Sequence, residues 1–451
     1  MLHKAGKRPY SLLCYKRAGK RPYSLLCYKK YGSLFALYLG PHYTVVVNNH
    51  QHAREVLLQR GRDFAGRPSM VTTDLLTRGG KDIAFSDYSP LWKSHRRLVH
   101  NSFTLLGRER AVDSLCVELM SAGCRGFDPS PAVTRAVTNV VCQLLIQYNN
   151  GIVQTITRGG LVDIFPWMKI FPNECLSKLK ECITVRDRLL TRKLEEHKVT
   201  STLSKGFKNL KTRSFTCCSG RGQKSPGSEE ERITDDHVLM TAAEAFGAGV
   251  ETTSTTLLWI LAYLLHHPEV RTPGACAEGA GRERGSERPV CMSDRSRLPY
   301  LDCVINEGMR IRPVSPVLIP HTAMTDSSIG GHSVSRGTRV LVNMWAIHHE
   351  PRHWDKPDLF NPDRFLDNQG QRVTPSYFLP FGAGPRVCVG ESLARLELFL
   401  FLSSMLQRIS FSLPEGAPPP NLQGRLGVVL QPLPYKVVVA PRAGLGGRIQ
   451  L

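Results

Sequence analysis

A glycine-rich loop near the C-terminus carries one cysteine and leads directly into a helix-forming segment. Residues 381–390 read FGAGPRVCVG, and residues 391–406 are expected to form an amphipathic helix. Gly382 and Gly384 permit backbone angles and close approaches that a Cβ would forbid. The amides of such a turn and the positive end of the following helix favour an ionised sulfur, so Cys388 is predicted to be a thiolate ligand of a metal. A buried structural cysteine after a turn is the alternative.

A long apolar run at 245–265 predicts a helix, and polar residues interrupt its middle. Glu251 and Thr252 lie there, and a buried helix needs a polar partner for each of them. This pattern favours a functional role for the two side chains. A kinked transmembrane helix is the alternative, but Glu244 and Glu251 interrupt the run and a His-His-Pro sequence ends it.

Together these motifs resemble the cytochrome P-450 family. Residues 381–390 match its cysteine-loop pattern FxxGxRxCxG, residues 248–253 match [AG]GxxT[TS], and residues 307–310 match ExxR. The resemblance implies a mainly α fold, with a helix-rich domain and a small β-rich N-terminal part. It also implies that haem b lies between the oxygen-activating helix and the cysteine loop, with Cys388 as the thiolate ligand of the iron.

The same resemblance assigns roles to further side chains. Thr252 and Glu251 are expected to deliver protons during oxygen activation. Glu307, Arg310 and Arg364 are expected to form a structural lock beneath the cysteine loop, through bidentate hydrogen bonds. Taken singly, an ExxR pair is more often a solvated surface pair. The expected haem contacts, several of them cations for the propionates, are Trp92, Arg96, Arg386, His321, Arg67 and Phe381.

Longer stretches resemble the steroid 17α-hydroxylase/17,20-lyase branch of this family, among them FGAGVETT, IPHTAMTDSSIGG and LVDIFPWMKIFPNECLSKLK. This implies 17α-hydroxylation of progesterone- or pregnenolone-type steroids, with electrons from NADPH supplied by NADPH-cytochrome P-450 reductase. Another steroid hydroxylase, such as a 21-hydroxylase, is an alternative. The residues expected to line the steroid pocket are Phe85, Thr155, Ala248, Val314 and Val428. Thr155 stands where relatives place an asparagine that binds the A-ring oxygen.

Carbon–carbon cleavage by this branch depends on cytochrome b5, an acidic protein that meets a basic proximal surface. Asn306 replaces an arginine of the relatives at this surface, while Arg295 and Arg395 keep two other matching basic positions. Loss of one cation weakens an interface with an acidic partner. We therefore expect cytochrome b5 binding to be weakened and 17,20-lyase activity to be weak or absent.

The net charge of +21 is concentrated in two stretches, residues 1–30 and 198–232. No nucleic-acid motif and no interleaved aromatic pattern accompanies it, so we expect no nucleic-acid partner. An acidic redox partner and a membrane surface explain the basic excess more simply. The 13 cysteines show no paired spacing, which favours free thiols in a reducing environment.

The chain is expected to form one haem-thiolate monooxygenase domain over residues 31–441, with a tail at 442–451. Residues 1–30 are a duplicated basic segment, in which AGKRPYSLLCYK occurs twice, and we interpret them as disordered or artefactual. They hold no apolar run long enough to span a membrane. The resemblance implies the endoplasmic reticulum membrane, and we expect this chain to lack an N-terminal anchor. Two β-type runs, 34–39 and 44–48, predict a hairpin.

Three segments depart from what the resemblance predicts: residues 141–148, 201–231 and 271–290. The first is shortened, and the other two have lost the apolar periodicity of a helix. These departures leave open the alternative that the chain is not an enzyme but a damaged or truncated gene product that lacks catalysis.

Overall fold

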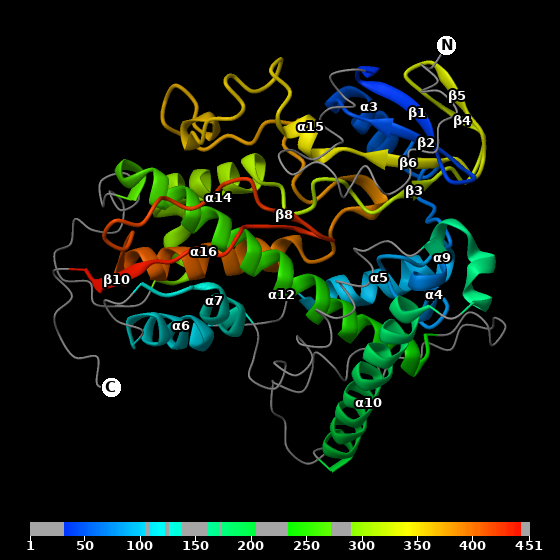
Figure 1. Ribbon diagram of the computed structural model, residues 1–451, viewed down its shortest axis with the longest axis horizontal. Helices are drawn as coiled ribbons and strands as arrows, with labels where there is room; N and C mark the ends of the chain where they lie inside the picture. Colours follow the sequence, from blue (N-terminus) through cyan, green and yellow to red (C-terminus); the bar gives the residue numbers. More distant parts are fainter. Residues whose placement is uncertain are drawn as a thin grey trace.

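The computed structural model describes residues 31–103, 109–121, 126–137, 161–171, 173–203, 233–271 and 290–442 (Figure 1). The α-helices are α3 (His50–Arg54), α4 (Val71–Leu76), α5 (Pro90–Phe103), α6 (Glu109–Ser121), α7 (Ser130–Val137), α9 (Leu161–Ile164), α10 (Glu174–Leu203), α12 (Asp235–His266), α14 (Pro299–Ile311), α15 (Met344–His348) and α16 (Glu391–Arg408). The strands are β1 (Leu34–Leu39), β2 (His42–Val47), β3 (His321–Thr322), β4 (Ser327–Ile329), β5 (His332–Val334), β6 (Arg339–Val342), β7 (Ile409–Ser412), β8 (Arg425–Leu426), β9 (Leu430–Gln431) and β10 (Val438–Pro441).

Several expectations fall outside the described residues. They concern the duplicated segment 1–30, the segment 141–148, residues 204–231 and 272–289, and most of the tail. Thr155 is also outside, so its predicted contact with a steroid stays a prediction. The helix α10 continues to Leu203, so the first three residues of the segment 201–231 are helical although the segment lacks the apolar periodicity of a helix.

The small sheet at one end of the molecule contains the predicted hairpin and two strands from far along the chain (Figure 1). β1 pairs antiparallel with β2, as expected, and the turn at Gly40 has φ of +62°. β2 then pairs in parallel with β6, and β6 pairs antiparallel with β3. The sheet order β1-β2-β6-β3 therefore ties the N-terminal hairpin to residues 321–342.

The central helix α12 crosses the helical part of the molecule (Figure 1). It begins at Asp235, earlier than the expected helix, because the N–H of Thr234 donates to His237 Nδ1 at 3.1 Å and two aspartates occupy the first turn. Among the described helices, α12 alone is long and apolar enough to cross a membrane, and 78% of its most apolar window is buried. That burial identifies a core helix.

The main core lies where α12, α14 and α16 pack together. Trp259 of α12, Val304 of α14 and Phe399 of α16 are all fully buried in it. The helix α16 was expected to be amphipathic, and this was wrong. All its residues from Glu397 to Leu406 are buried, because neighbouring elements cover the helix on every side.

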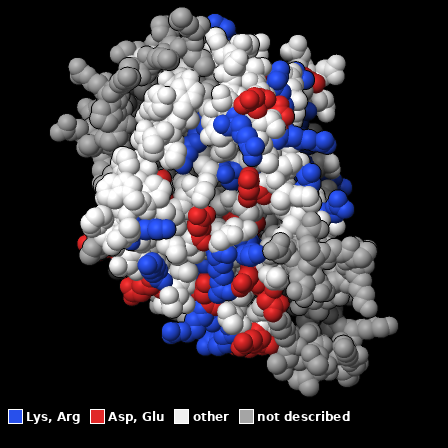
Figure 2. Space-filling model, turned by 90° about the vertical axis from the view of Figure 1, so that its right-hand side faces the viewer, with Lys and Arg blue, Asp and Glu red and all other residues white. Residues whose placement is uncertain are grey.

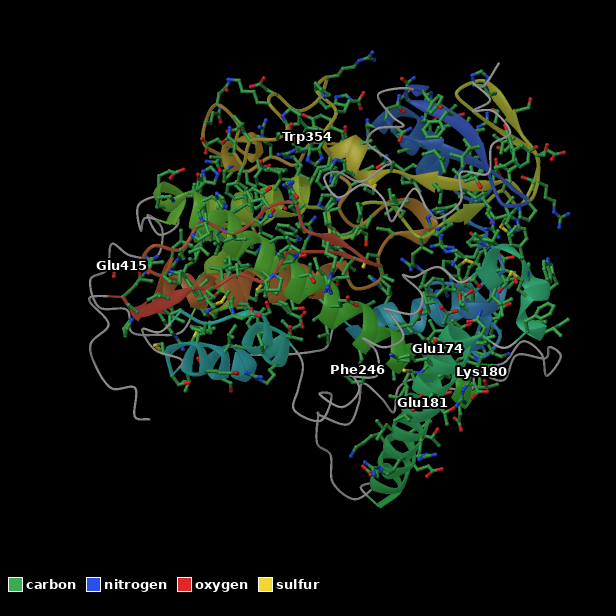
Figure 3. All side chains as sticks on the ribbon, viewed as in Figure 1. Glu174, Lys180, Glu181, Phe246, Trp354 and Glu415 are labelled. Carbon is green, nitrogen blue, oxygen red and sulfur yellow. The ribbon has the colours of Figure 1, made fainter. Side chains whose placement is uncertain are left out.

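A second, smaller contact joins the long helix α10 to the first half of α12. Leu190 and Leu194 of α10 pack there against Leu239 and Met240 of α12, with Phe246 at the edge (Figure 3). On the face shown in Figure 2, basic and acidic side chains are interspersed. Among the residues that the structure describes, no continuous basic track runs across this face.

Candidate active site

The cysteine loop is shaped by close backbone contacts. Gly382 and Gly384 have φ of +73° and +71°, in the left-handed region that favours glycine. A Cβ on Gly384 would lie 1.7 Å from the carbonyl oxygen of Leu57, so only glycine allows this approach. The N–H of Cys388 donates to the carbonyl of Phe381 at 2.9 Å, which closes the loop three residues before α16 begins at Glu391.

The surrounding protein raises the pKa of the Cys388 thiol. Burial is the largest cause of the rise, and the nearby carboxylate of Glu391 adds to it. A hydrogen bond from Gly390 and the charge of Arg96 act in the opposite direction but are outweighed. Within the protein alone, burial therefore outweighs the amides and the helix end that were expected to favour the thiolate, and the predicted role of Cys388 as a thiolate ligand stays a prediction. A metal ion bound to the sulfur would supply the missing positive charge, since a coordinating thiol is deprotonated.

Four predicted basic residues converge beside the loop, from four separate parts of the chain. Arg67 donates to the carbonyl oxygens of Ala84 (2.7 Å), Ile319 and Pro320 (both 2.9 Å). Arg96 donates to the carbonyl of Val387, and His321 Nδ1 lies 2.8 Å from the carbonyl of Phe64. Arg386 donates to the carbonyls of Ala65 (2.8 Å), Ile83 (3.2 Å) and Ser86 (2.9 Å).

The three arginines repel one another, and the charges of Arg67 and Arg386 also keep His321 neutral. Burial and the charge of Arg386 lower the pKa of Arg67 to about 9. Burial and the charge of Arg67 lower the pKa of His321 to about 3. Burial, with Arg96 adding to it, lowers the pKa of Arg386 to about 10. Because the guanidiniums donate to neutral carbonyls, the cluster suits an anionic group such as the propionates of a haem.

Trp92 lies inside this cluster but not in the expected role. Its indole N–H donates to the carbonyl of Ile83 at 2.9 Å, so the protein itself satisfies this donor. Its ring instead faces two guanidiniums, Arg386 at 4.1 Å and Arg96 at 5.5 Å from the ring centre. Trp92 therefore orients the two arginines through cation–π contacts.

The polar residues Glu251 and Thr252, in the middle of α12, lie next to an exposed strip of the same helix. Ala248 and Gly249 are exposed, although most of α12 is buried. The hydroxyl of Thr252 donates to the carbonyl of Ala248 at 2.6 Å, which leaves its oxygen free to accept a hydrogen bond. The helix is continuous through these residues.

Glu251 has a partner that the sequence did not indicate. The side-chain amide of Gln431, on β9, donates to Glu251 Oε1 at 3.0 Å. Burial raises the pKa of Glu251, and this hydrogen bond partly offsets the rise. Gln431 lies far from α12 in the sequence and belongs to no motif, so nothing in the sequence pointed to this contact.

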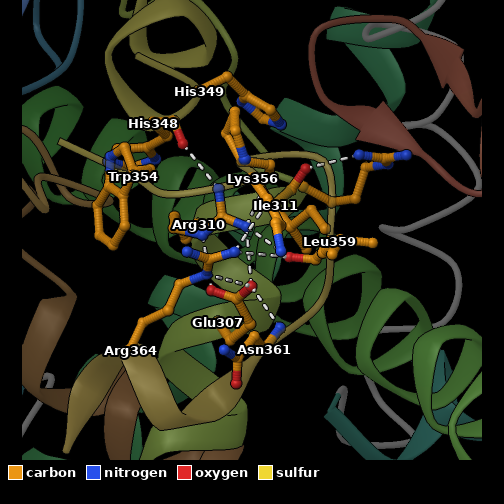
Figure 4. A network of polar contacts seen from close by, with 12 residues as sticks. Glu307, Arg310, Ile311, His348, His349, Trp354, Lys356, Leu359, Asn361 and Arg364 are labelled. Carbon is orange, nitrogen blue, oxygen red and sulfur yellow. Dashed lines mark hydrogen bonds and ion pairs between the residues drawn. The ribbon is translucent and has the colours of Figure 1, made fainter. Parts of the chain in front are cut away.

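The predicted lock is assembled at the end of α14 (Figure 4). Glu307 and Arg310 are fully buried and make two hydrogen bonds, of 2.6 and 2.8 Å. Arg310 also donates to the carbonyls of His348 (2.8 Å) and Pro357 (2.9 Å). Arg364 Nε lies 3.5 Å from Glu307, and the backbone N–H of Asn361 donates to the same carboxylate at 2.8 Å.

The described pocket residues come from separate elements. Phe85 is partly buried in the segment after α4, and Val428 is 47% exposed between β8 and β9. The N–H of Leu430 donates to the carbonyl of Val314 at 2.9 Å, which joins the β8–β9 hairpin to the segment after α14. The predicted pocket residues Val314 and Val428 therefore lie on adjacent segments of the chain.

The profile of the family described as Cytochrome P450 matches residues 11–439. The chain belongs to the cytochrome P450 family. Like other cytochromes P450, it is a monooxygenase of the helix-rich fold predicted from the sequence. The family holds haem through a cysteine thiolate and receives electrons from a reductase.

Among its relatives, the steroid 17-alpha-hydroxylase/17,20 lyase of Gallus gallus is 48% identical, over 93% of this chain and 87% of the relative. The protein of the same name from Squalus acanthias is also 48% identical, over 90% and 84%. A solved structure described as zebra fish cytochrome P450 with progesterone is 55% identical, with a TM-score of 0.80. It matches 92% of this chain and 98% of that structure.

The residues of this P450 fit the haem that its family carries. Cys388 would bind the iron, and Arg67, Arg96, Arg386 and His321 would face the propionates. The raised pKa of the thiol and the mutual repulsion of the cations are both relieved by a group that combines a metal ion with carboxylates.

Proposed function

We propose that this cytochrome P450 is a steroid 17α-monooxygenase that acts on progesterone- or pregnenolone-type steroids. The observation that carries the proposal is the 55% identity, at a TM-score of 0.80, to a zebra fish P450 whose structure contains progesterone. The names of the curated relatives support it. Haem with a thiolate ligand supplies the oxygen-activating chemistry when bound.

The protein's own residues bind the steroid and deliver protons. Phe85, Ala248, Val314 and Val428 enclose the apolar steroid and exclude water. Glu251 has a raised pKa and stores a proton, and the hydroxyl of Thr252 passes it toward the reacting oxygen. NADPH-cytochrome P-450 reductase supplies the electrons on the side of Cys388.

We further propose that the 17,20-lyase activity is weak or absent. Asn306 stands where relatives carry an arginine for cytochrome b5, and it is 4% exposed. It therefore offers no cation to an acidic partner. Arg395 is 24% exposed in its side chain and keeps a positive charge at this surface, although Glu391 pairs with it at 2.9 Å.

The proposed location is the cytoplasmic surface of the endoplasmic reticulum membrane. Large apolar side chains gather next to α9, where Trp167 is 60%, Ile170 79% and Phe171 57% exposed. Aromatic and aliphatic residues in one short exposed stretch suit the boundary between headgroups and acyl chains. Membrane flotation should therefore decrease when Trp167 and Ile170 are both replaced by serine.

The function is tested with expressed protein, the reductase, NADPH and progesterone. We expect 17α-hydroxyprogesterone as the main product and an absorption maximum of thiolate type in the reduced carbon monoxide complex. Cys388→His should abolish both, because the thiolate is lost. Steroid turnover retained by Cys388→His would overturn the assignment of Cys388. A 21-hydroxylated product would favour another steroid hydroxylase, and absence of any haem spectrum would favour a product without catalysis.

A further inference from the structure

Two acids outside the predicted machinery, the buried Asp82 and the half-buried Glu244, hold the segment that carries Phe85. Glu244, on α12, accepts the backbone N–H of Ile83 on Oε2 and that of Ala84 on Oε1, both at 2.9 Å. Asp82 is 1% exposed and accepts the N–H of Phe85 on Oδ2 at 2.7 Å. Three consecutive amides of this segment are therefore held by two carboxyl groups.

The opposite side of the same segment is held by the cation cluster. The carbonyl of Ile83 accepts from Trp92 and Arg386, and the carbonyl of Ala84 accepts from Arg67. The segment 82–86 therefore lies between carboxyl groups that bind its amides and cations that bind its carbonyls. Its position affects both the haem contacts and the steroid wall.

The two carboxyl groups face each other. Glu244 and Asp82 lie within hydrogen-bonding reach, and burial raises the pKa of Glu244, with Asp82 the next cause. Asp82 Oδ1 is buried and has no donor among the groups that the structure describes. Two carboxylates cannot satisfy each other without a proton, whereas a protonated Glu244 donates directly to Asp82.

We infer that Asp82 and Glu244 share one proton and act as a clasp that fixes the segment 82–86 on α12, thereby positioning Phe85 for steroid binding. The steroid part of this inference rests on the proposed function. Glu244 and Asp82 are positioning residues, because they act through the backbone of the segment.

The groups around the clasp favour a single proton on the pair of carboxyl groups, held by Glu244. Arg67 and Arg386 face Asp82 from the cation cluster, and Asp87 lies directly after the segment near both arginines. Loss of the shared proton leaves two like charges in contact, which opens the clasp. Steroid affinity should therefore fall as pH rises through the pKa of Glu244.

The clasp is tested by amide hydrogen exchange on the full-length holoenzyme without steroid. In Glu244→Gln, one of the two amides of Ile83 and Ala84 faces an NH₂ group, so exchange in the segment should accelerate at least tenfold. Glu55→Gln is the matched control, since Glu55 accepts the N–H of Gly330 at 2.8 Å elsewhere. It should leave the segment 82–86 unchanged. Equal exchange in the parent and Glu244→Gln would overturn the clasp.

Progesterone binding, measured by equilibrium dialysis between about pH 6 and pH 9, tests the consequence. We expect the affinity of the parent to fall about tenfold or more as pH rises. Asp82→Asn should bind nearly independently of pH, because its amide donates to Glu244 in place of the shared proton. An unchanged pH dependence in Asp82→Asn would overturn the shared proton. A parent that binds no progesterone at any pH would refute the steroid function and the steroid part of the inference, while amide exchange still decides the clasp.

Discussion

Arg395 of α16 donates a hydrogen bond from Nη1 to the side-chain oxygen of Asn306 on α14, at 3.2 Å. The guanidinium also pairs with Glu391 at 2.9 Å and lies 4.9 Å from the ring centre of Phe381 in the cysteine loop. Asn306 is buried, so it acts on the proximal surface by orienting Arg395 and not by direct contact with a partner.

The contact between Arg395 and Asn306 determines what an arginine at position 306 would do to the proposed cytochrome b5 surface. Asn306→Arg would place a longer, charged side chain in a buried position beside Arg395. We expect it to lower the free energy of unfolding by about 1–3 kcal/mol and to leave b5-stimulated cleavage low. Thermal unfolding and a b5 titration of both steroid products check this. A stable Asn306→Arg protein with strong b5-dependent cleavage would show that the arginine reaches the surface.

Thr252→Ala should lower the ratio of product formed to NADPH consumed by about tenfold or more. The reason is that the hydroxyl of Thr252 lies at the exposed strip of α12, next to Glu251. Thr252→Ser should restore the ratio. Thr256→Ala is the matched control, because Thr256 donates to the carbonyl of Thr252 at 2.8 Å in the same way but is buried. Coupling that is equal in Thr252→Ala and the parent would leave Thr252 with a structural role alone.

Arg310→Lys should destabilise the fold by about 3–5 kcal/mol, since a lysine cannot make the bidentate bonds to Glu307 together with those to two carbonyls. Chemical unfolding followed by tryptophan fluorescence measures the loss. The control is Arg192→Lys in the exposed pair with Glu196, at 3.6 Å, where a change below about 1 kcal/mol is expected. Similar losses in both variants would contradict a buried lock.

The burial of His348 should make the free energy of unfolding depend on pH. Its Nε2 accepts the N–H of Leu379 at 3.1 Å, and burial, followed by the charge of Arg310, lowers its pKa well below the usual value. In the unfolded chain His348 binds a proton as pH falls through about 6.5, whereas in the folded chain it stays neutral. Unfolding at lower pH therefore takes up a proton. Stability is therefore fully present above about pH 6.5 and falls as pH falls, by up to about 1.4 kcal/mol per pH unit.

The variant His348→Gln keeps an acceptor for Leu379 and removes the titrating ring. Between about pH 6.5 and pH 5, its unfolding temperature should fall less steeply than that of the parent. His100→Gln, at an exposed position, is the control and should follow the parent. Parallel slopes for all three proteins would show that His348 is not the group responsible.

Local patterns determined the parts of this protein in which neighbours in sequence are neighbours in space. The glycines of the cysteine loop, the spacing of Glu307 and Arg310, and the β1–β2 hairpin each depend on backbone geometry within a few residues. Such geometry follows from the residue types themselves. The family resemblance extended these patterns to the fold, which the comparisons confirmed.

Tertiary structure alone decided the contacts between distant segments and the charge states that burial controls. No periodicity indicated that β6 would join β2, that Gln431 would bind Glu251, or that Asn306 would be buried. The loop amides and the helix end suggested a low pKa for the Cys388 thiol, but desolvation by the packed chain outweighs them. Desolvation depends on which atoms surround a group, and that is set by packing across the whole chain.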